Sequence, residues 1–174
     1  MSEIPTDDLL AGERILSAHQ QLESDDPIFD PKLRPSLASA LERTSGRVGD
    51  YRVPFASGSL EHHAEIPEQN LFRCLFGRDS LIISSLLRDT DPNLSLQTVC
   101  ALAEHQGATF DSLSEEEPGR IAHEVRDKND PQAIRIAAEA GWRFPYYGSV
   151  DATLLWLIAL EQLCETDNDI LELE

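Results

Sequence analysis

The stretch FGRDSLIISSLL, residues Phe76–Leu87, places an Arg-Asp pair directly before a run of apolar and serine residues. The run predicts a helix that is buried on nearly all sides. Burying either charge of the pair without a partner is costly, so Arg78 and Asp79 must face water, each other or a ligand. We therefore treat the start of this helix as a candidate binding site.

A second uncharged run, Ala152–Leu160, follows Asp151 in the same way and predicts a second buried helix. Helical periodicity dominates the chain, and no Asn-Gly or Asp-Gly turn between alternating runs indicates a hairpin. The expected class is all-α, with residues 1–174 as a single domain. Helices that are apolar all round need neighbours on every side, which a two-layered ring of helices would provide.

Capping residues and breakers predict where the elements begin and end. We expect helices from Thr6 to Pro27, from Pro35 to about Gly46, at 78–88, from Asp91 to Gly107, from Asp130 to Ala140 and at 149–164. Residues 47–69 carry several glycines and prolines, and predict a long structured loop with a short extended piece at 51–53. Long structured loops in compact domains are often functional.

The charge of the chain limits its partners. The sequence has 32 acidic and 14 basic residues, a formal charge of −18, which repels nucleic acid phosphates and anionic lipid surfaces. No nucleic acid or membrane partner is expected. The N-terminus is acidic and has no apolar signal region, so we expect a cytoplasmic protein. Twelve of the fourteen cations are arginine, and such an acidic, lysine-poor composition suits a protein that works in high salt.

The cysteines and histidines do not predict a metal or redox site. Cys74, Cys100 and Cys164 are odd in number and have no Cys-x-x-Cys spacing, so we expect reduced core residues. His123-Glu124 lacks a second histidine four residues on, and His62-His63 reads as part of a loop. Without a phosphate-binding glycine loop, no cofactor is expected.

Three polar stretches precede or open helices: GRDS (77–80), EEEPGRIAHEVR (115–126) and PYYGSVDATLLW (145–156). Each has an ordinary structural explanation, because acidic and hydroxyl residues cap helices and charged runs often face solvent. Taken together they favour sugar binding. Carboxylates accept hydrogen bonds from hydroxyl pairs, and aromatic rings stack on the C–H face of a sugar.

The stretches FGRDSLI, EEPGRIAHEVR and YYGSVDAT, in that order, resemble the signature of the amylo-α-1,6-glucosidase family, the glucosidase portion of glycogen debranching enzymes. The resemblance covers roughly residues 72–163, and the Arg-Asp-Ser element is also similar to that of glucoamylases. It implies an (α/α)6 barrel of the six-hairpin glycosidase type, of which this chain would form about half the toroid. It also implies these substrate-binding residues: Arg78, Asp79, Glu117, His123, Glu124, Arg126, Tyr147 and Asp151.

The resemblance has departures. Leu154 and Trp156 stand where the family has proline and phenylalanine, and Arg120 where lysine is common. The family's catalytic acid is expected in a later Trp-Lys-Asp-Ser-like element, which this sequence lacks, and the base later still. No catalytic residue is therefore assigned, with Asp151 as the alternative acid.

The resemblance implies a glycoside hydrolase-type protein of α-glucan metabolism, incomplete and inactive alone. The alternatives are a non-catalytic carbohydrate-binding half-barrel, or a helical scaffold or interaction protein. The expected partners are an α-glucan and either a complementary half-barrel or a second copy of the chain, because the apolar helices need cover.

Overall fold

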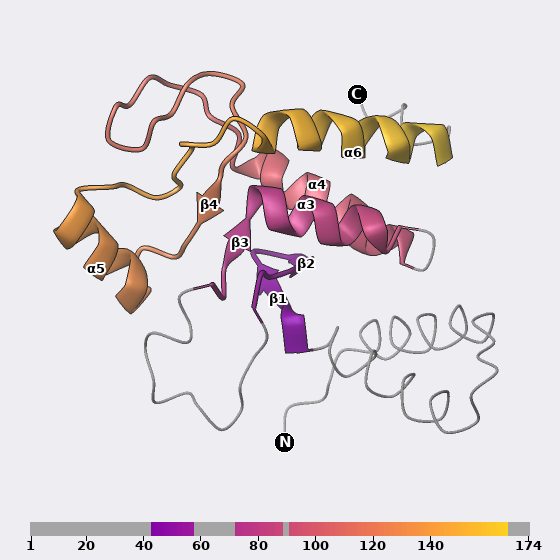
Figure 1. The fold of residues 1–174 in the computed structure, drawn as a ribbon, viewed down its shortest axis with the longest axis horizontal. Coiled ribbons are helices and arrows are strands. Elements are labelled where there is room, and N and C mark those ends of the chain that lie inside the picture. The colour runs from indigo at the N-terminus through magenta and orange to yellow at the C-terminus, as the bar shows by residue number, and fades with distance from the viewer. Residues whose placement is uncertain (1–42, 58–71, 89–90, 167–174) are drawn as a thin grey trace.

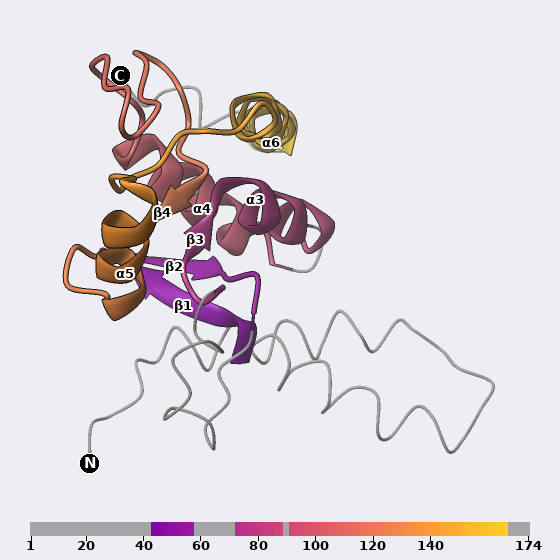
Figure 2. The same cartoon turned by 60° about the vertical axis from the view of Figure 1, so that its left-hand side comes forward.

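The structure is a computed structural model and describes residues 43–57, 72–88 and 91–166. In chain order its elements are β1 (Ser45–Val48), β2 (Tyr51–Pro54), β3 (Leu75–Phe76), α3 (Gly77–Leu86), α4 (Pro92–Glu104), β4 (Glu124–Val125), α5 (Pro131–Ala140) and α6 (Ala152–Thr166). Helices α3 and α4 lie between α6 and the β1–β2 hairpin (Figures 1 and 2). Strands β3 and β4 form a second, separate pair beside the start of α3.

The prediction of an all-α class, with the chain as about half of an (α/α)6 barrel, is wrong: the described residues mix helices with two antiparallel sheets. In the hairpin Val48 lies opposite Tyr51, so Gly49 and Asp50 form a two-residue turn. Gly49 has a φ of +56°, which glycine adopts without strain and which such turns require. A Gly-Asp pair is itself a hairpin signal, and it lies within the expected loop 47–69.

Most of the helix boundaries expected in the described residues are confirmed. Asp91 accepts a hydrogen bond from the Leu94 amide, 3.1 Å, and Pro92 follows it at the first position of α4. Asp130 caps α5 in the same way, and Gly141, with a φ of +74°, ends it. The extended piece expected at 51–53 lies within β2.

Several expectations fall outside the described residues. They are the helix from Thr6 to Pro27, most of the helix from Pro35, the second half of the 47–69 loop and the His62-His63 pair. Residues 45–48 are extended, so the expectation that the helix from Pro35 continues to about Gly46 is wrong at its end.

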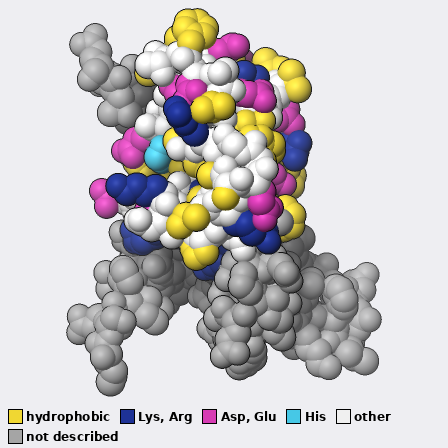
Figure 3. All heavy atoms as spheres, turned by 90° about the vertical axis from the view of Figure 1, so that its left-hand side faces the viewer, with side chains coloured by type: hydrophobic (Ala, Val, Ile, Leu, Met, Phe, Trp, Pro, Cys, Tyr) yellow, Lys and Arg dark blue, Asp and Glu magenta, His cyan; other side chains and the backbone are white. Residues whose placement is uncertain are grey.

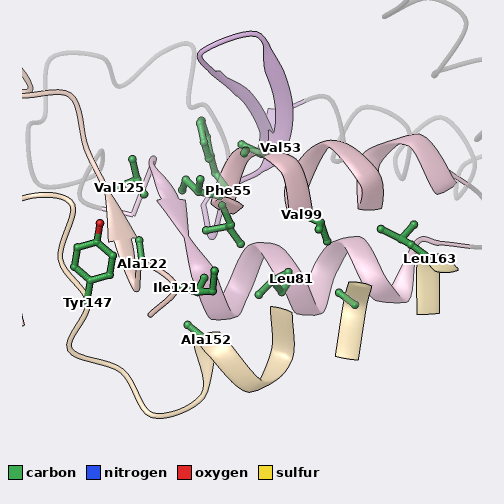
Figure 4. Close-up of a cluster of buried hydrophobic side chains, with 14 residues drawn as sticks. Val53, Phe55, Leu81, Val99, Ile121, Ala122, Val125, Tyr147, Ala152 and Leu163 are labelled. Carbon is green, nitrogen blue, oxygen red and sulfur yellow. The ribbon is translucent and has the colours of Figure 1, made fainter. Parts of the chain in front are cut away.

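The core joins all the elements that surround α3 (Figure 4). The Ser80 hydroxyl donates to the Pro54 carbonyl, 2.6 Å, which fixes α3 on the hairpin. The Trp156 indole donates to the Val99 carbonyl, 2.9 Å, which fixes α6 on α4. The largest fully buried apolar side chains are Leu75, Leu81, Leu94, Leu102, Ile121 and Val53.

Neither apolar helix is buried on all sides, which corrects the expectation from the sequence. In α6 the face formed by Ala152, Ala159 and Leu163 is buried, whereas Leu154 and Leu157 are 62% and 51% exposed. In α3 the buried face is built from small residues and Leu81, and Leu86 is 79% exposed. Among the described helices, none combines the length and the apolar character needed to cross a membrane.

Candidate functional site

The three polar stretches singled out in the sequence meet at Gly77, the first residue of α3. The Gly77 amide donates to the His123 carbonyl, 2.8 Å, next to the β3–β4 pairing. A Cβ atom on Gly77 would lie 2.2 Å from the Ala122 carbonyl oxygen and 3.1 Å from Cβ of Ala152. Ala122 and Ala152 flank this turn of α3 in the core (Figure 4). Glycine is thus required for this close approach.

Two further contacts hold the second and third stretches together. The Ile121 amide donates to the Thr153 hydroxyl, 3.1 Å, and Tyr146 pairs with Glu124 through backbone hydrogen bonds of 2.9 and 3.0 Å. The Arg120 guanidinium also donates to the Ser149 carbonyl, 3.4 Å. Segments 77–80, 120–126 and 146–153 therefore form one connected unit.

Three of the predicted residues form an exposed cluster at the adjoining starts of α3 and α6, which we call the Arg78 cluster: Arg78, Asp79 and Asp151. Nη1 of Arg78 donates to Oδ2 of Asp151, 3.2 Å, and Nε of Arg78 lies 3.8 Å from Oδ2 of Asp79. All three side chains remain between 38% and 47% exposed. Surface ion pairs of this kind contribute little to stability, so the cluster is accessible to a ligand at small cost.

Asp151 is held as a carboxylate. The Ser149 hydroxyl donates to its Oδ1, 2.5 Å, and this bond, together with Arg78, lowers the pKa of Asp151 below its usual value. The same hydroxyl accepts from the Ala152 amide, 3.1 Å, so Ser149 caps the start of α6. A carboxylate with a lowered pKa accepts hydrogen bonds from hydroxyl groups, whereas a general acid requires a raised pKa.

Two other predicted residues, Glu124 and Arg126, lie in a buried ion cluster. The Arg126 side chain is fully buried; its Nε donates to Glu124 and its Nη1 to Asp130, 3.0 Å. Cζ of its guanidinium lies 6.0 Å from the centre of the Phe76 ring and 5.9 Å from the centre of the Phe144 ring. This cluster fastens β4 to β3 and to the start of α5.

Cys74 contributes to the same buried cluster, and its thiol contacts Oε1 of Glu124 at 3.8 Å. Burial raises the pKa of the Cys74 thiol, so it stays protonated at neutral pH and is a poor nucleophile. The structure shows all three cysteines free, with Cys74 alone fully buried, in partial agreement with the expected core positions.

The remaining predicted residues are dispersed. Glu117 is on the surface, 62% exposed, with Arg120 3.9 Å away. Tyr147 is buried, and its hydroxyl donates to the His105 carbonyl, 3.0 Å; burial and then Glu116 raise its pKa. Its ring is part of the core and so is not free to stack on a sugar.

His123 lies between two aromatic rings, with its ring centre 5.8 Å from that of Phe76 and 6.4 Å from that of Tyr146. Its Nδ1 atom is buried and has no hydrogen-bond partner among the described residues. A buried nitrogen without a partner is unusual in proteins.

Sequence reasoning did not select Tyr146, Glu115 or Trp142. The Tyr146 hydroxyl donates to Glu115, 2.8 Å, and the Trp142 ring stacks on the Tyr146 ring. The contact between Tyr146 and Glu115 joins residues 31 positions apart, so no local sequence pattern indicates it.

Metal ligands do not gather here: within residues 43–57, 72–88 and 91–166 no three His, Cys, Asp or Glu side chains are placed to hold an ion. Comparison of the chain with models of known protein families gives no match, and comparison with curated proteins gives no significant one.

Proposed function

We propose that this chain binds the terminal glucose of an α-glucan through the Arg78 cluster, as a glycoside hydrolase-type protein similar to the amylo-α-1,6-glucosidases. The observation that carries the proposal is the meeting of the three family-like stretches at Gly77. Residues that are far apart in the sequence, Arg78 and Asp151, are brought into contact at that point.

The chemistry of the Arg78 cluster suits neighbouring hydroxyl groups. A guanidinium offers several donors in one plane, and two carboxylates offer acceptors on either side of it. A pair of ring hydroxyls, each both donor and acceptor, can replace the 3.8 Å contact between Arg78 and Asp79 by shorter hydrogen bonds. We assign Arg78, Asp79 and Asp151 to sugar binding.

The same geometry argues against hydrolysis by these residues alone. An inverting glycosidase needs an acid and a base on opposite sides of the sugar, about 6.5–9.5 Å apart. Asp79 and Asp151 both lie against one guanidinium, and the pKa of Asp151 is lowered. We therefore assign the cluster a binding role and keep the carbohydrate-binding protein without hydrolysis as the alternative.

Titration of the purified chain with maltose and isomaltose tests the proposal, with the β-linked disaccharide cellobiose for comparison. We expect binding of the α-linked sugars that is lost in Arg78→Ala and weakened in Asp151→Asn. Arg135→Ala, an exposed arginine on α5, is the matched control and should bind normally. Equal binding by wild type and Arg78→Ala contradicts the proposal.

Release of glucose from maltose, isomalto-oligosaccharides and glycogen limit dextrin gives a second test. We expect no turnover by the purified chain. Turnover that disappears in Asp151→Asn would make Asp151 the acid and overturn the binding-only assignment.

A helical interaction protein is the second candidate function, and one observation favours it. Helix α6 keeps Leu154, Leu157 and Ile158 exposed along one face. Exposed apolar surface of this kind is typical of protein contact sites. An unchanged sugar titration in Arg78→Ala together with self-association through α6 would favour this candidate.

A further inference from the structure

Trp142 presents an aromatic ring to solvent at the end of α5. It follows Gly141, which ends the helix in the left-handed conformation, and it is 38% exposed. Its ring is parallel to that of Tyr146, with an interplanar angle of 5° and ring centres 4.2 Å apart. One face of the indole is thus covered by Tyr146. We call these two residues the Trp142 platform.

Tyr146 is held firmly beneath Trp142. Its hydroxyl donates to Oε1 of Glu115, 2.8 Å, and its backbone pairs with Glu124. Gly148 packs so closely that a Cβ atom there would lie 2.3 Å from the Tyr146 hydroxyl oxygen. Because the Trp142 indole stacks on a ring fixed in this way, it loses little conformational freedom when a ligand stacks on its other face.

The polar groups around the platform suit hydroxyl groups. Glu115 has a φ of +54°, a conformation that non-glycine residues rarely adopt and that is concentrated at functional sites. Its Oε1 is used by Tyr146, and Arg143, with a side chain 64% exposed, pairs with Asp111 at 3.1 Å. Apolar and charged side chains lie side by side on the face that carries α5 (Figure 3).

We propose that the Trp142 platform is a second sugar subsite, at which the C–H face of a glucose unit stacks on the indole while Glu115 and Arg143 bind its hydroxyls. The inference rests on the proposed function, because it takes the ligand to be the glucan whose terminal unit occupies the Arg78 cluster. Asp151 is nine positions after Trp142, so their Cα atoms lie at most about 30 Å apart. One oligosaccharide chain reaching both subsites gains affinity from the second contact without a second loss of freedom.

The test compares maltose with maltoheptaose on the full chain. We expect Trp142→Ala to weaken maltoheptaose binding about five- to tenfold and to leave maltose binding unchanged. Trp142→Phe should retain part of the affinity, since it keeps an aromatic face. Phe110→Ala, which removes another aromatic ring with 82% exposure, is the matched control and should change neither affinity.

The outcomes separate this inference from the proposed function. Maltoheptaose binding that is equal in wild type and Trp142→Ala overturns the platform, and leaves the proposed function intact if Arg78→Ala still loses maltose. Maltoheptaose binding that depends on Trp142 but not on Arg78 supports the platform and contradicts the proposed function. Failure of both sugars to bind overturns both. Thermal melts of each variant exclude loss of folding as the cause.

Discussion

Gly77→Ala tests the junction on which the site depends. An added Cβ would lie 2.2 Å from the Ala122 carbonyl oxygen, and ordinary contacts begin at 3.4 Å, so the start of α3 and the segment before β4 must separate by roughly 1 Å. Backbone on both sides makes this relaxation expensive. Overpacking costs about 1–3 kcal/mol and the loss of the hydrogen bond from Gly77 to His123 about 1 kcal/mol more.

A gain in helix propensity of up to about 1 kcal/mol offsets part of this cost, so we expect a net destabilisation of about 2–3 kcal/mol. For a domain of this size that lowers Tm by roughly 5–10 °C. The assay is thermal and urea denaturation followed by circular dichroism. Leu86→Ala, on the same helix and 79% exposed, is the control and should shift stability by less than about 0.5 kcal/mol. A Gly77→Ala variant as stable as wild type would refute the convergence of the three stretches.

Three further predictions concern stability and association. Arg126→Met should lower the free energy of unfolding, measured by urea denaturation, by about 3–5 kcal/mol, because it leaves Glu124 buried without its cationic partner. Adding Glu124→Gln should recover part of this loss. A double variant that recovers none of it contradicts the pairing. Burial lowers the pKa of His105, so as the pH falls the unfolded chain binds a proton at a higher pH than the folded chain does. Stability should therefore fall as the pH drops below 6.5. A series of melts at different pH in which His105→Gln shows the same dependence of stability on pH as wild type contradicts this. Two copies should associate through the uncharged stretch 152–160 of α6 when molar salt screens the −18 charge. Sedimentation should show this association for wild type and not for Leu157→Glu. A wild-type chain that stays monomeric at all salt concentrations contradicts the prediction.

The sequence predicted the helices well wherever caps and breakers are local. Asp91-Pro92, Asp130-Pro131 and Gly141 act within one turn of the chain, so their effect is visible without the rest of the fold. The extended piece at 51–53 was predicted, but the pairing of β3 with β4 was not, because these strands have two residues each and pair across separations of 48 and 50 residues. No alternation can be read from two residues, and a distant partner leaves no local pattern.

Burial was overestimated for a different reason. An uncharged stretch such as 152–160 shows that burial is tolerated on every side, but it does not show that neighbours are present on every side. Within the part of the chain that the structure describes, α6 packs mainly against α3 and α4. The pattern therefore predicts a helix and one buried face, and the rest depends on tertiary contacts.

The polar residues of the three stretches divide into two groups with different roles, and sequence alone does not separate them. Arg126, Glu124 and Tyr147 are buried and fasten the segment around β4 in place, whereas Arg78 and Asp151 are half exposed and lie where a ligand can reach them. An arginine in a buried ion cluster and an arginine in a ligand site cannot be told apart in the sequence, because they differ only in their neighbours in the structure. Because removing a buried partner leaves an unpaired charge, loss of Arg126 acts first on stability. Loss of Arg78 removes a pair that is worth little in water and, under the proposed function, should act on binding. The ratio of these two effects, measured in each variant, is what distinguishes a residue that builds the site from one that contacts the sugar.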